Sequence, residues 1–133
     1  MKIKHLLLVL VFAAMTFTAK AQVSFSCYHR EYCEWDDNMK TFSSECTGYD
    51  EPSLFVINEQ ETMFTHTTEN IKSTYYVKEK NYDENNEVWT YDVVSDAGNK
   101  YYYIFDPKNK EIRVLSESDD YNTMIRFLVK AIF

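Results

Sequence analysis

Three cysteines and two histidines are the residues beyond position 21 with the most reactive side chains. Four of them, Cys27, His29, Cys33 and Cys46, carry the nitrogen and sulfur donors of a structural zinc site. Their spacing, Cys-x-His-x₃-Cys-x₁₂-Cys, matches no standard zinc motif, so we expect no metal and no other cofactor. His66 lies between two threonines, which is typical of a polar surface position on a strand.

The three cysteines predict one disulfide and one free thiol if the chain folds in an oxidising compartment. Asp36-Asp37-Asn38 is a turn signal between strand-like runs at residues 24–34 and 40–46. A hairpin folded there brings Cys27 nearly opposite Cys46, and we therefore expect a Cys27–Cys46 disulfide. Cys33–Cys46 is the alternative and needs a less regular hairpin. Either bridge is expected to stabilise the fold by about 2–4 kcal/mol.

Familiar catalytic and nucleotide-binding motifs are missing from the sequence. Gly48 and Gly98 stand alone, which excludes a phosphate-binding loop and a dinucleotide fingerprint, and there is no G-x-S-x-G sequence. The acidic runs at residues 36–37, 83–84 and 118–120 lack the order of a calcium-binding loop. No pair of carboxylates is singled out for glycoside hydrolysis. The sequence thus points away from an enzyme.

Residues 87–117 predict three consecutive strands joined by two tight turns. Asp96-Ala97-Gly98 forms the first turn, with the glycine at positive φ, and a four-residue loop at residues 107–110 forms the second. This register places all the aromatic pairs on one face, because side chains alternate along a strand. We expect that face to be core; its members are Trp89, Tyr91, Val93, Tyr101, Tyr103, Phe105, Ile112 and Val114.

The strand expected near residues 72–82 extends this meander, and the reverse face of the extended meander is the candidate ligand-binding surface. It carries Tyr76, Tyr102, Ile104, Arg113 and Leu115. Tyrosine has an apolar ring and a polar tip, so such a face suits stacking on a sugar or binding of a peptide. The alternatives are that the N-terminal hairpin covers this face in a sandwich, or that it lines the inside of a barrel.

The rest of the chain continues the pattern of short strands. We expect strands near residues 53–58, 62–68, 72–82 and 123–132, with a polar connector at 47–52; the last strand also fits a helical period. This spacing predicts an all-β fold, an antiparallel meander of about eight to nine strands. The meander would form either an up-and-down barrel of lipocalin-like architecture or a two-sheet sandwich.

The first 21 residues have the features of a cleaved secretory signal peptide. A basic start is followed by an apolar run of about twelve residues and by Ala19-Lys20-Ala21, which fits the small-x-small cleavage rule. The run is too short for a membrane span, so we expect an exported protein, periplasmic or secreted, with no span after cleavage. Residues 22–133 would then form a single small β domain, with a cysteine-bearing hairpin at 22–48 and the meander at 53–133.

Charge limits the range of partners. Loss of the three lysines in residues 1–21 takes the formal net charge from −7 to −10, which disfavours nucleic acid as a partner. We expect an exported, non-enzymatic binding or interaction module that uses a tyrosine-rich sheet face or a barrel interior. Its partner would be an unidentified small molecule, glycan or protein. The alternatives are a small hydrolase whose site, with His66, is assembled across strands, and a protease inhibitor or edge-strand partner.

Overall fold

The structure is a computed structural model that describes residues 22–133, and the expected signal peptide lies outside these residues. The described part of the chain folds into nine strands and one short 3₁₀ turn. These elements are β1 (Val23–Asp36), β2 (Thr41–Phe42), β3 (Thr47–Ile57), β4 (Met63–Thr67), β5 (Lys72–Asp83), β6 (Val88–Ser95), β7 (Lys100–Asp106), β8 (Glu111–Ser116), η1 (Glu117–Asp119) and β9 (Thr123–Ile132). No helix within residues 22–133 has the length and apolar character needed to cross a membrane.

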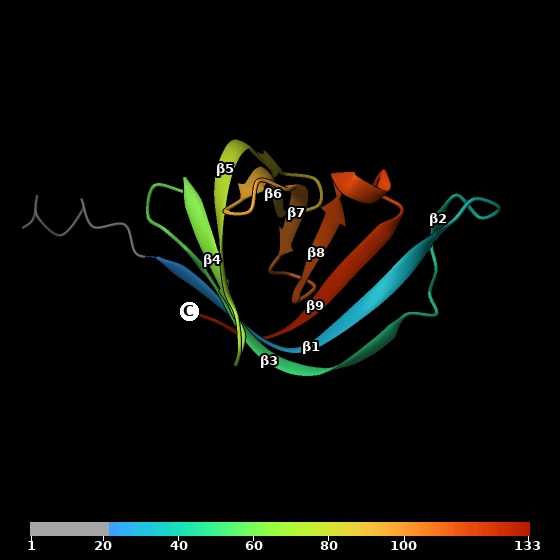
Figure 1. Ribbon diagram of the computed structural model, residues 1–133, viewed down its shortest axis with the longest axis horizontal. Coiled ribbons are helices and arrows are strands. Elements are labelled where there is room, and N and C mark those ends of the chain that lie inside the picture. Colours follow the sequence, from blue (N-terminus) through green and yellow to red (C-terminus); the bar gives the residue numbers. More distant parts are fainter. Residues whose placement is uncertain (1–21) are drawn as a thin grey trace, which may run out of the picture.

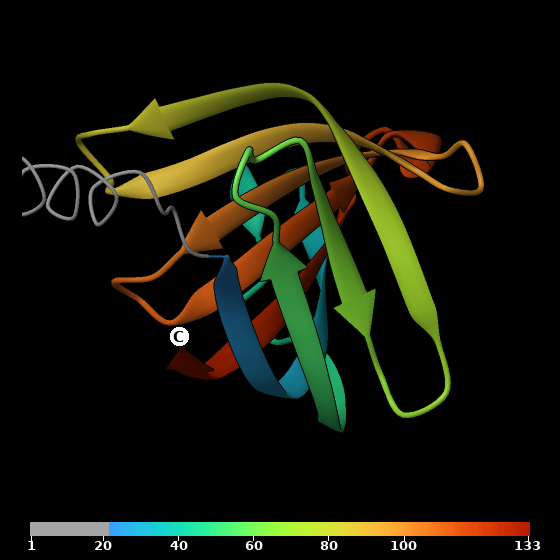
Figure 2. The ribbon, with the colours of Figure 1, turned by 90° about the vertical axis from the view of Figure 1, so that its left-hand side faces the viewer.

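The strands form a closed antiparallel barrel (Figures 1 and 2). From β3 to β9 each strand pairs with the next along the chain, and β1 pairs with both β3 and β9. Eight strands therefore form a ring, and β2 pairs only with the far end of β1, outside it. The expected all-β antiparallel meander is confirmed, and it adopts the barrel rather than the two-sheet sandwich.

The register predicted for residues 87–117 is confirmed. Trp89 pairs with Phe105 and Tyr91 with Tyr103, and the β7–β8 pairing places Ile112 beside Phe105. Gly98 closes the first turn at a φ of 87°, and its N–H donates to the Ser95 carbonyl at 2.9 Å. The turn and the aromatic pattern thus specify the same register.

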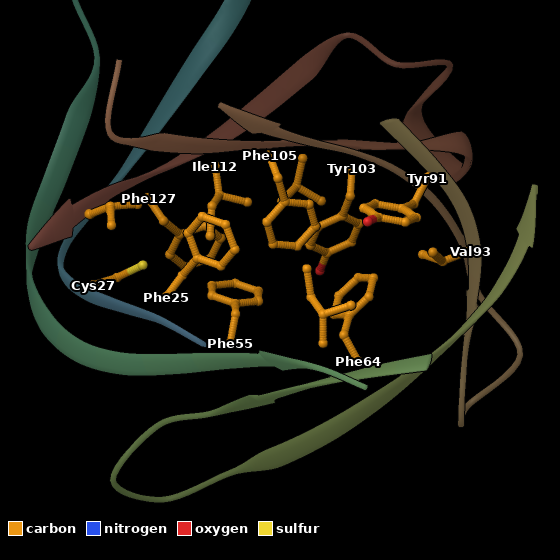
Figure 3. Close-up of a cluster of buried hydrophobic side chains, with 13 residues drawn as sticks. Phe25, Cys27, Phe55, Phe64, Tyr91, Val93, Tyr103, Phe105, Ile112 and Phe127 are labelled. Carbon is orange, nitrogen blue, oxygen red and sulfur yellow. The ribbon is translucent and has the colours of Figure 1, made fainter. Parts of the chain in front are cut away.

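An aromatic cluster fills the middle of the barrel (Figure 3). Phe55 and Phe64 on one side of the interior point toward Tyr103 and Phe105 on the other, and all four are buried. Six of the eight expected core residues of the meander are buried. The exceptions are Trp89, which is 36% exposed, and Tyr101, which is half-buried. Both line openings of the barrel rather than its centre.

The N-terminal part differs from the expected hairpin. Only Trp35 with Phe42 and Asp36 with Thr41 pair as β1 and β2, and β1 otherwise pairs with β3 and β9. Residues 47–52, expected as a connector, belong to β3. Pro52 is accommodated at an irregularity of the β1–β3 pairing, because proline has no N–H to donate to a regular ladder.

The pairing in β1 shifts between Cys27 and His29, and this irregularity changes which residues face inward. Phe25 and Cys27 face the interior before the shift. After it, Arg30 faces inward, where its guanidinium lies over the ring of the core residue Phe127. Strict alternation from Cys27 would instead have sent His29 inward and Arg30 outward.

The shift also decides the disulfide. The bond joins Cys33 to Cys46, with a Cα–Cα distance of 4.6 Å, so the expected Cys27–Cys46 pairing is wrong and the alternative is observed. The short hairpin returns Cys46 to Cys33 near the end of β1.

Cys27 is the free thiol, buried in the aromatic cluster (Figure 3). Burial raises the pKa of the Cys27 thiol to about 12, which keeps it protonated.

Candidate functional site

The barrel has a cavity at each end, and the aromatic cluster separates the two. One cavity, of about 340 Å³, lies where β7 begins, and we call it the polar opening. Charged and polar side chains from β1, β3, β4, β5 and β7 line it together with apolar ones. Its lining residues are Arg30, Tyr49, Glu51, His66, Thr68, Ile71, Ser73, Tyr75, Tyr101, Tyr103, Val114, Ile125 and Phe127.

An ion pair between Arg30 and Glu51 lies in the polar opening. Arg30 comes from β1 just beyond the shift, and Glu51 from the part of β3 that precedes Pro52. Arg30 Nη1 lies 3.5 Å from Glu51 Oε1, an ion-pair contact longer than a normal hydrogen bond. The guanidinium Cζ also lies 5.2 Å and 5.3 Å from the ring centroids of Tyr32 and Phe127, within the range of a cation–π interaction. The ion pair is thus held against aromatic rings.

Three buried polar atoms in this opening lack a hydrogen-bond partner among the described residues: Arg30 Nε, Glu51 Oε1 and His66 Nε2. Buried polar atoms normally have partners, and an unpaired one costs about 1–3 kcal/mol. Only six such side-chain atoms occur in residues 22–133, so half of them surround one cavity. The unpaired polar groups are therefore concentrated at one end of the barrel.

His66 is buried, and its expected position as a polar surface residue is wrong. It is 8% exposed, and its ring stacks on Phe55 with centroids 4.0 Å apart and planes 4° apart. Burial, and to a lesser extent the charge of Arg30, lower the pKa of His66 to about 4, so the imidazole is neutral at pH 7. A general base works best with a pKa near the working pH. The environment of His66 therefore suits a neutral hydrogen-bonding group better than a base.

Tyrosines form the opposite side of the polar opening. Tyr75 packs against Tyr101 and Tyr103, with ring centroids 5.8 Å and 5.1 Å apart. Burial raises the pKa of Tyr101 and of Tyr103, so both hydroxyls stay protonated and can donate as well as accept. Tyr49 lies on the rim and is 48% exposed. The opening thus presents aromatic rings next to hydrogen-bonding groups.

The cavity at the other end, of about 420 Å³, is the apolar opening. Most of its lining is hydrophobic, and the full lining is Val23, Phe25, Ile57, Asn58, Glu59, Glu61, Trp89, Tyr91, Phe105, Pro107 and Ile132. The Tyr91 hydroxyl donates to Glu61 Oε1 at 3.0 Å, and Lys80 Nζ donates to Glu61 Oε2 at 3.2 Å. The innermost polar groups at this end therefore have partners.

The candidate residues Tyr76, Tyr102, Ile104, Arg113 and Leu115 lie on the outer face of the barrel wall. The N-terminal hairpin does not pack over them as a second sheet, and they do not line the interior. Tyr76 is 46% exposed and the other four are half-buried. Three of them, Tyr102, Ile104 and Arg113, line one surface depression, whereas Tyr76 and Leu115 do not.

Arg113 in that depression already has two acidic partners. Its Nη1 donates to Asp106 Oδ2 at 3.1 Å and also to Glu111 Oε1. Asp106 itself is 2% exposed and accepts hydrogen bonds from the Asn109 backbone and side chain. This outer arrangement is a satisfied network, in contrast to the polar opening.

Sequence reasoning did not identify Arg30 and Glu51 as site residues. Regular alternation along β1 predicts an outward Arg30, because the irregularity at residues 27–29 that turns it inward cannot be seen in the sequence. Glu51 did have a signal, because Tyr49, Glu51, Ser53, Phe55 and Ile57 keep a period of two through Pro52. All five line the interior or are buried, as that period predicts.

The fold and the site define a closed eight-stranded antiparallel β-barrel with a polar cavity at one end. No protein-family model matches the chain, and comparisons with curated proteins and with solved structures gave no significant match.

Proposed function

We propose that this protein is an exported, non-enzymatic binding protein that holds a small molecule in the polar opening of its barrel. The observation that carries the proposal is the set of three buried polar atoms without a hydrogen-bond partner in the described chain, Arg30 Nε, Glu51 Oε1 and His66 Nε2, around one cavity. A ligand that hydrogen-bonds to these atoms would remove the unfavourable free energy of leaving them unpaired.

The size and position of the cavity support the same proposal. The interior of an eight-stranded barrel is either filled by side chains or holds one small ligand. Here the aromatic cluster fills the middle, and the polar opening retains about 340 Å³, a volume typical of small-molecule pockets. Rings and a few convergent polar groups are the usual lining of such pockets.

The remaining parts of the proposal rest on other features. The neutral His66, whose Nε2 has no hydrogen-bond partner among residues 22–133, favours binding over acid–base catalysis. The Cys33–Cys46 disulfide is compatible with an oxidising compartment, as is the export signal expected at residues 1–21. The outer depression lined by Tyr102, Ile104 and Arg113 is the second candidate site.

A matched pair of variants tests the site. Residues 22–133 would be screened against a small-molecule library by thermal unfolding, because a ligand of the folded state at 100 times its Kd adds about 2.7 kcal/mol of stability. Arg30→Gln is expected to reduce the stabilisation by the hits, whereas Arg113→Gln on the outer face should retain it. The reverse pattern would move the site to the outer depression, and a library without hits would contradict the proposal.

A further inference from the structure

We propose that the ligand of the polar opening is an uncharged carbohydrate. This inference rests on the proposed function, and it adds the chemical class of the ligand. It is drawn from the charges around the cavity, from its unpaired hydrogen-bonding atoms, and from the aromatic rings beside them.

Charge is the first argument. Arg30 and Glu51 line the cavity together, with Nη1 and Oε1 only 3.5 Å apart. Any ligand that carries a net charge is attracted by one of them and repelled by the other, so neither sign is favoured. His66 adds no charge, since the imidazole is neutral at pH 7. The opening therefore favours a ligand without net charge.

Hydrogen bonding is the second argument. Arg30 Nε is a donor that needs an acceptor, and Glu51 Oε1 is an acceptor that needs a donor. These two requirements belong to side chains in contact, so the ligand has to present a donor and an acceptor side by side. A hydroxyl group is both. Two neighbouring hydroxyls on a sugar ring meet the requirement without any charge.

The aromatic rings are the third argument. Tyr75 and Tyr101 line the same cavity and are half-buried, and Tyr49 on the rim is 48% exposed. A sugar ring has apolar C–H edges as well as hydroxyls, and a tyrosine offers an apolar ring with a polar tip. A sugar can therefore contact these rings with its C–H groups while its hydroxyls reach the ion pair.

A zwitterion such as a free amino acid also carries a donor and an acceptor without net charge. Both of its charges would lose water on entering the cavity. The charges of Arg30 and Glu51 are already paired with each other, so their attraction to the zwitterion would compensate less of its desolvation free energy. A hydroxyl loses much less on desolvation. This difference favours the sugar, and the amino acid becomes an outcome of the test.

The test is isothermal titration of residues 22–133 with four sets of probes: methyl glycosides of neutral hexoses, uronic acids, amino sugars and free amino acids. We expect neutral glycosides to bind, and uronic acids and amino sugars to bind about tenfold more weakly. Tighter binding of a charged sugar or of an amino acid would overturn the inference of an uncharged carbohydrate and leave the proposed function standing. Absence of binding by any neutral glycoside would overturn it as well.

Two isosteric variants sharpen the test by changing the charge balance. In Glu51→Gln the positive charge of Arg30 is unopposed, so the preference should shift about tenfold toward uronic acids. In Arg30→Gln it should shift similarly toward amino sugars. Glu111→Gln, on the outer wall, is the matched control and should keep the wild-type ranking. An unchanged ranking in both cavity variants would overturn the inference; if either variant failed to fold by circular dichroism, the wild-type ranking would decide alone.

Discussion

The two ends of the barrel rest on the same aromatic cluster but treat their polar groups in opposite ways. At the apolar opening, the buried Tyr91 hydroxyl donates to Glu61, and Lys80 completes the pairing of that carboxylate. At the polar opening, Arg30 and His66 keep buried nitrogen atoms without partners in the described chain. Both cavities are of similar size, so volume alone does not distinguish them.

The buried polar atoms without hydrogen-bond partners among the described residues lower the stability of the folded chain at the polar opening. The apolar opening shows that the same barrel can pair its buried polar groups. Unpaired buried groups that persist together are characteristic of functional sites, where the ligand rather than the protein provides the partner. The contrast between the ends, more than either cavity alone, supports the proposal that the polar opening is the binding site.

The largest expected effect on stability comes from removing one ring of the aromatic cluster on which both ends rest. Phe55 packs against His66 on the polar side and against Phe105 and Phe127 in the centre. We expect Phe55→Ala to lower the free energy of unfolding by about 3–5 kcal/mol, because it removes a fully buried ring and leaves a cavity. Urea denaturation measures the change. Met39→Ala, at a position 72% exposed, should change stability by less than about 0.5 kcal/mol. A loss below about 1 kcal/mol for Phe55→Ala would contradict the role given to the cluster.

The disulfide should affect the two ends unequally. Cys33–Cys46 closes the segment that leads from β1 into the first half of β3, which carries Tyr49 and Glu51. We expect Cys46→Ser to lower stability by about 2–4 kcal/mol and to increase hydrogen exchange in β3 near Glu51. Exchange in β6 near Trp89 should stay unchanged. Cys27→Ala, which leaves the disulfide intact, is the control for loss of a cysteine. Equal loss of protection at both ends would show that the bond acts on the whole barrel.

Acid should weaken the protein through the polar opening first. The unfolded chain binds a proton at His66 near pH 6.5, but the folded chain does so only near pH 4, because burial lowers the pKa. Stability from the neutral His66 is therefore complete above pH 6.5. It declines as the pH falls from 6.5 toward 4, by on the order of 3 kcal/mol. The lowered pKa values of Asp83 and Asp106 act in a separate window, with their stabilisation lost as the pH falls below about 3.8.

Denaturation at a series of pH values, compared between wild type and His66→Gln, measures this term. The variant should show a much flatter dependence between pH 6.5 and 4. Identical curves for the two proteins would mean that His66 is protonated equally in the folded and unfolded states.

The smallest expected effect separates binding from stability. Replacing both partners of the ion pair, Arg30→Met with Glu51→Met, removes two buried atoms that lack a hydrogen-bond partner within residues 22–133 together with the ion pair itself. Replacing a poorly solvated ion pair by apolar side chains is often neutral or favourable. We expect stability to be unchanged or raised by up to about 1 kcal/mol, while ligand binding is lost; urea denaturation and titration measure the two. Tyr91→Phe at the apolar opening is the matched contrast and should lower stability by about 1 kcal/mol, because its hydrogen bond is satisfied. A double variant that lost several kcal/mol would contradict the contrast between the ends.

The sequence was sufficient to predict strand pairing where two independent signals agreed. In the meander, Gly98 and the alternation of aromatic residues specify one register, and the structure has that register. The last segment fits a helical period as well as a strand period; a strand is the prediction, and β9 is a strand. Barrel and sandwich share these local signals, since closure depends on the pairing of β1 with β9 far apart in the chain.

The candidate site was harder to predict because it depends on one irregularity. Alternation through Cys27 and His29 assigns Arg30 to the outside, and the shift in β1 reverses that assignment. The same shift separates Cys27 from Cys33 and so changes the disulfide. A register shift in a strand leaves no compositional mark, so the outer tyrosine face is the most visible candidate in the sequence.

Closure of the ring also has a consequence for how the chain folds. Phe25 pairs with Ile132, so β1, which is synthesised before the other strands of the barrel, acquires its last neighbour only after β9 has been made. Such distant pairings slow folding, and an unpaired strand edge invites association with other copies of the chain. During that delay the irregularity and the charges of Arg30 and Glu31 interrupt the exposed edge of β1. The irregularity in β1 and the charge of Arg30, which shape the polar opening in the closed barrel, thus also disfavour aggregation through this strand before the barrel closes.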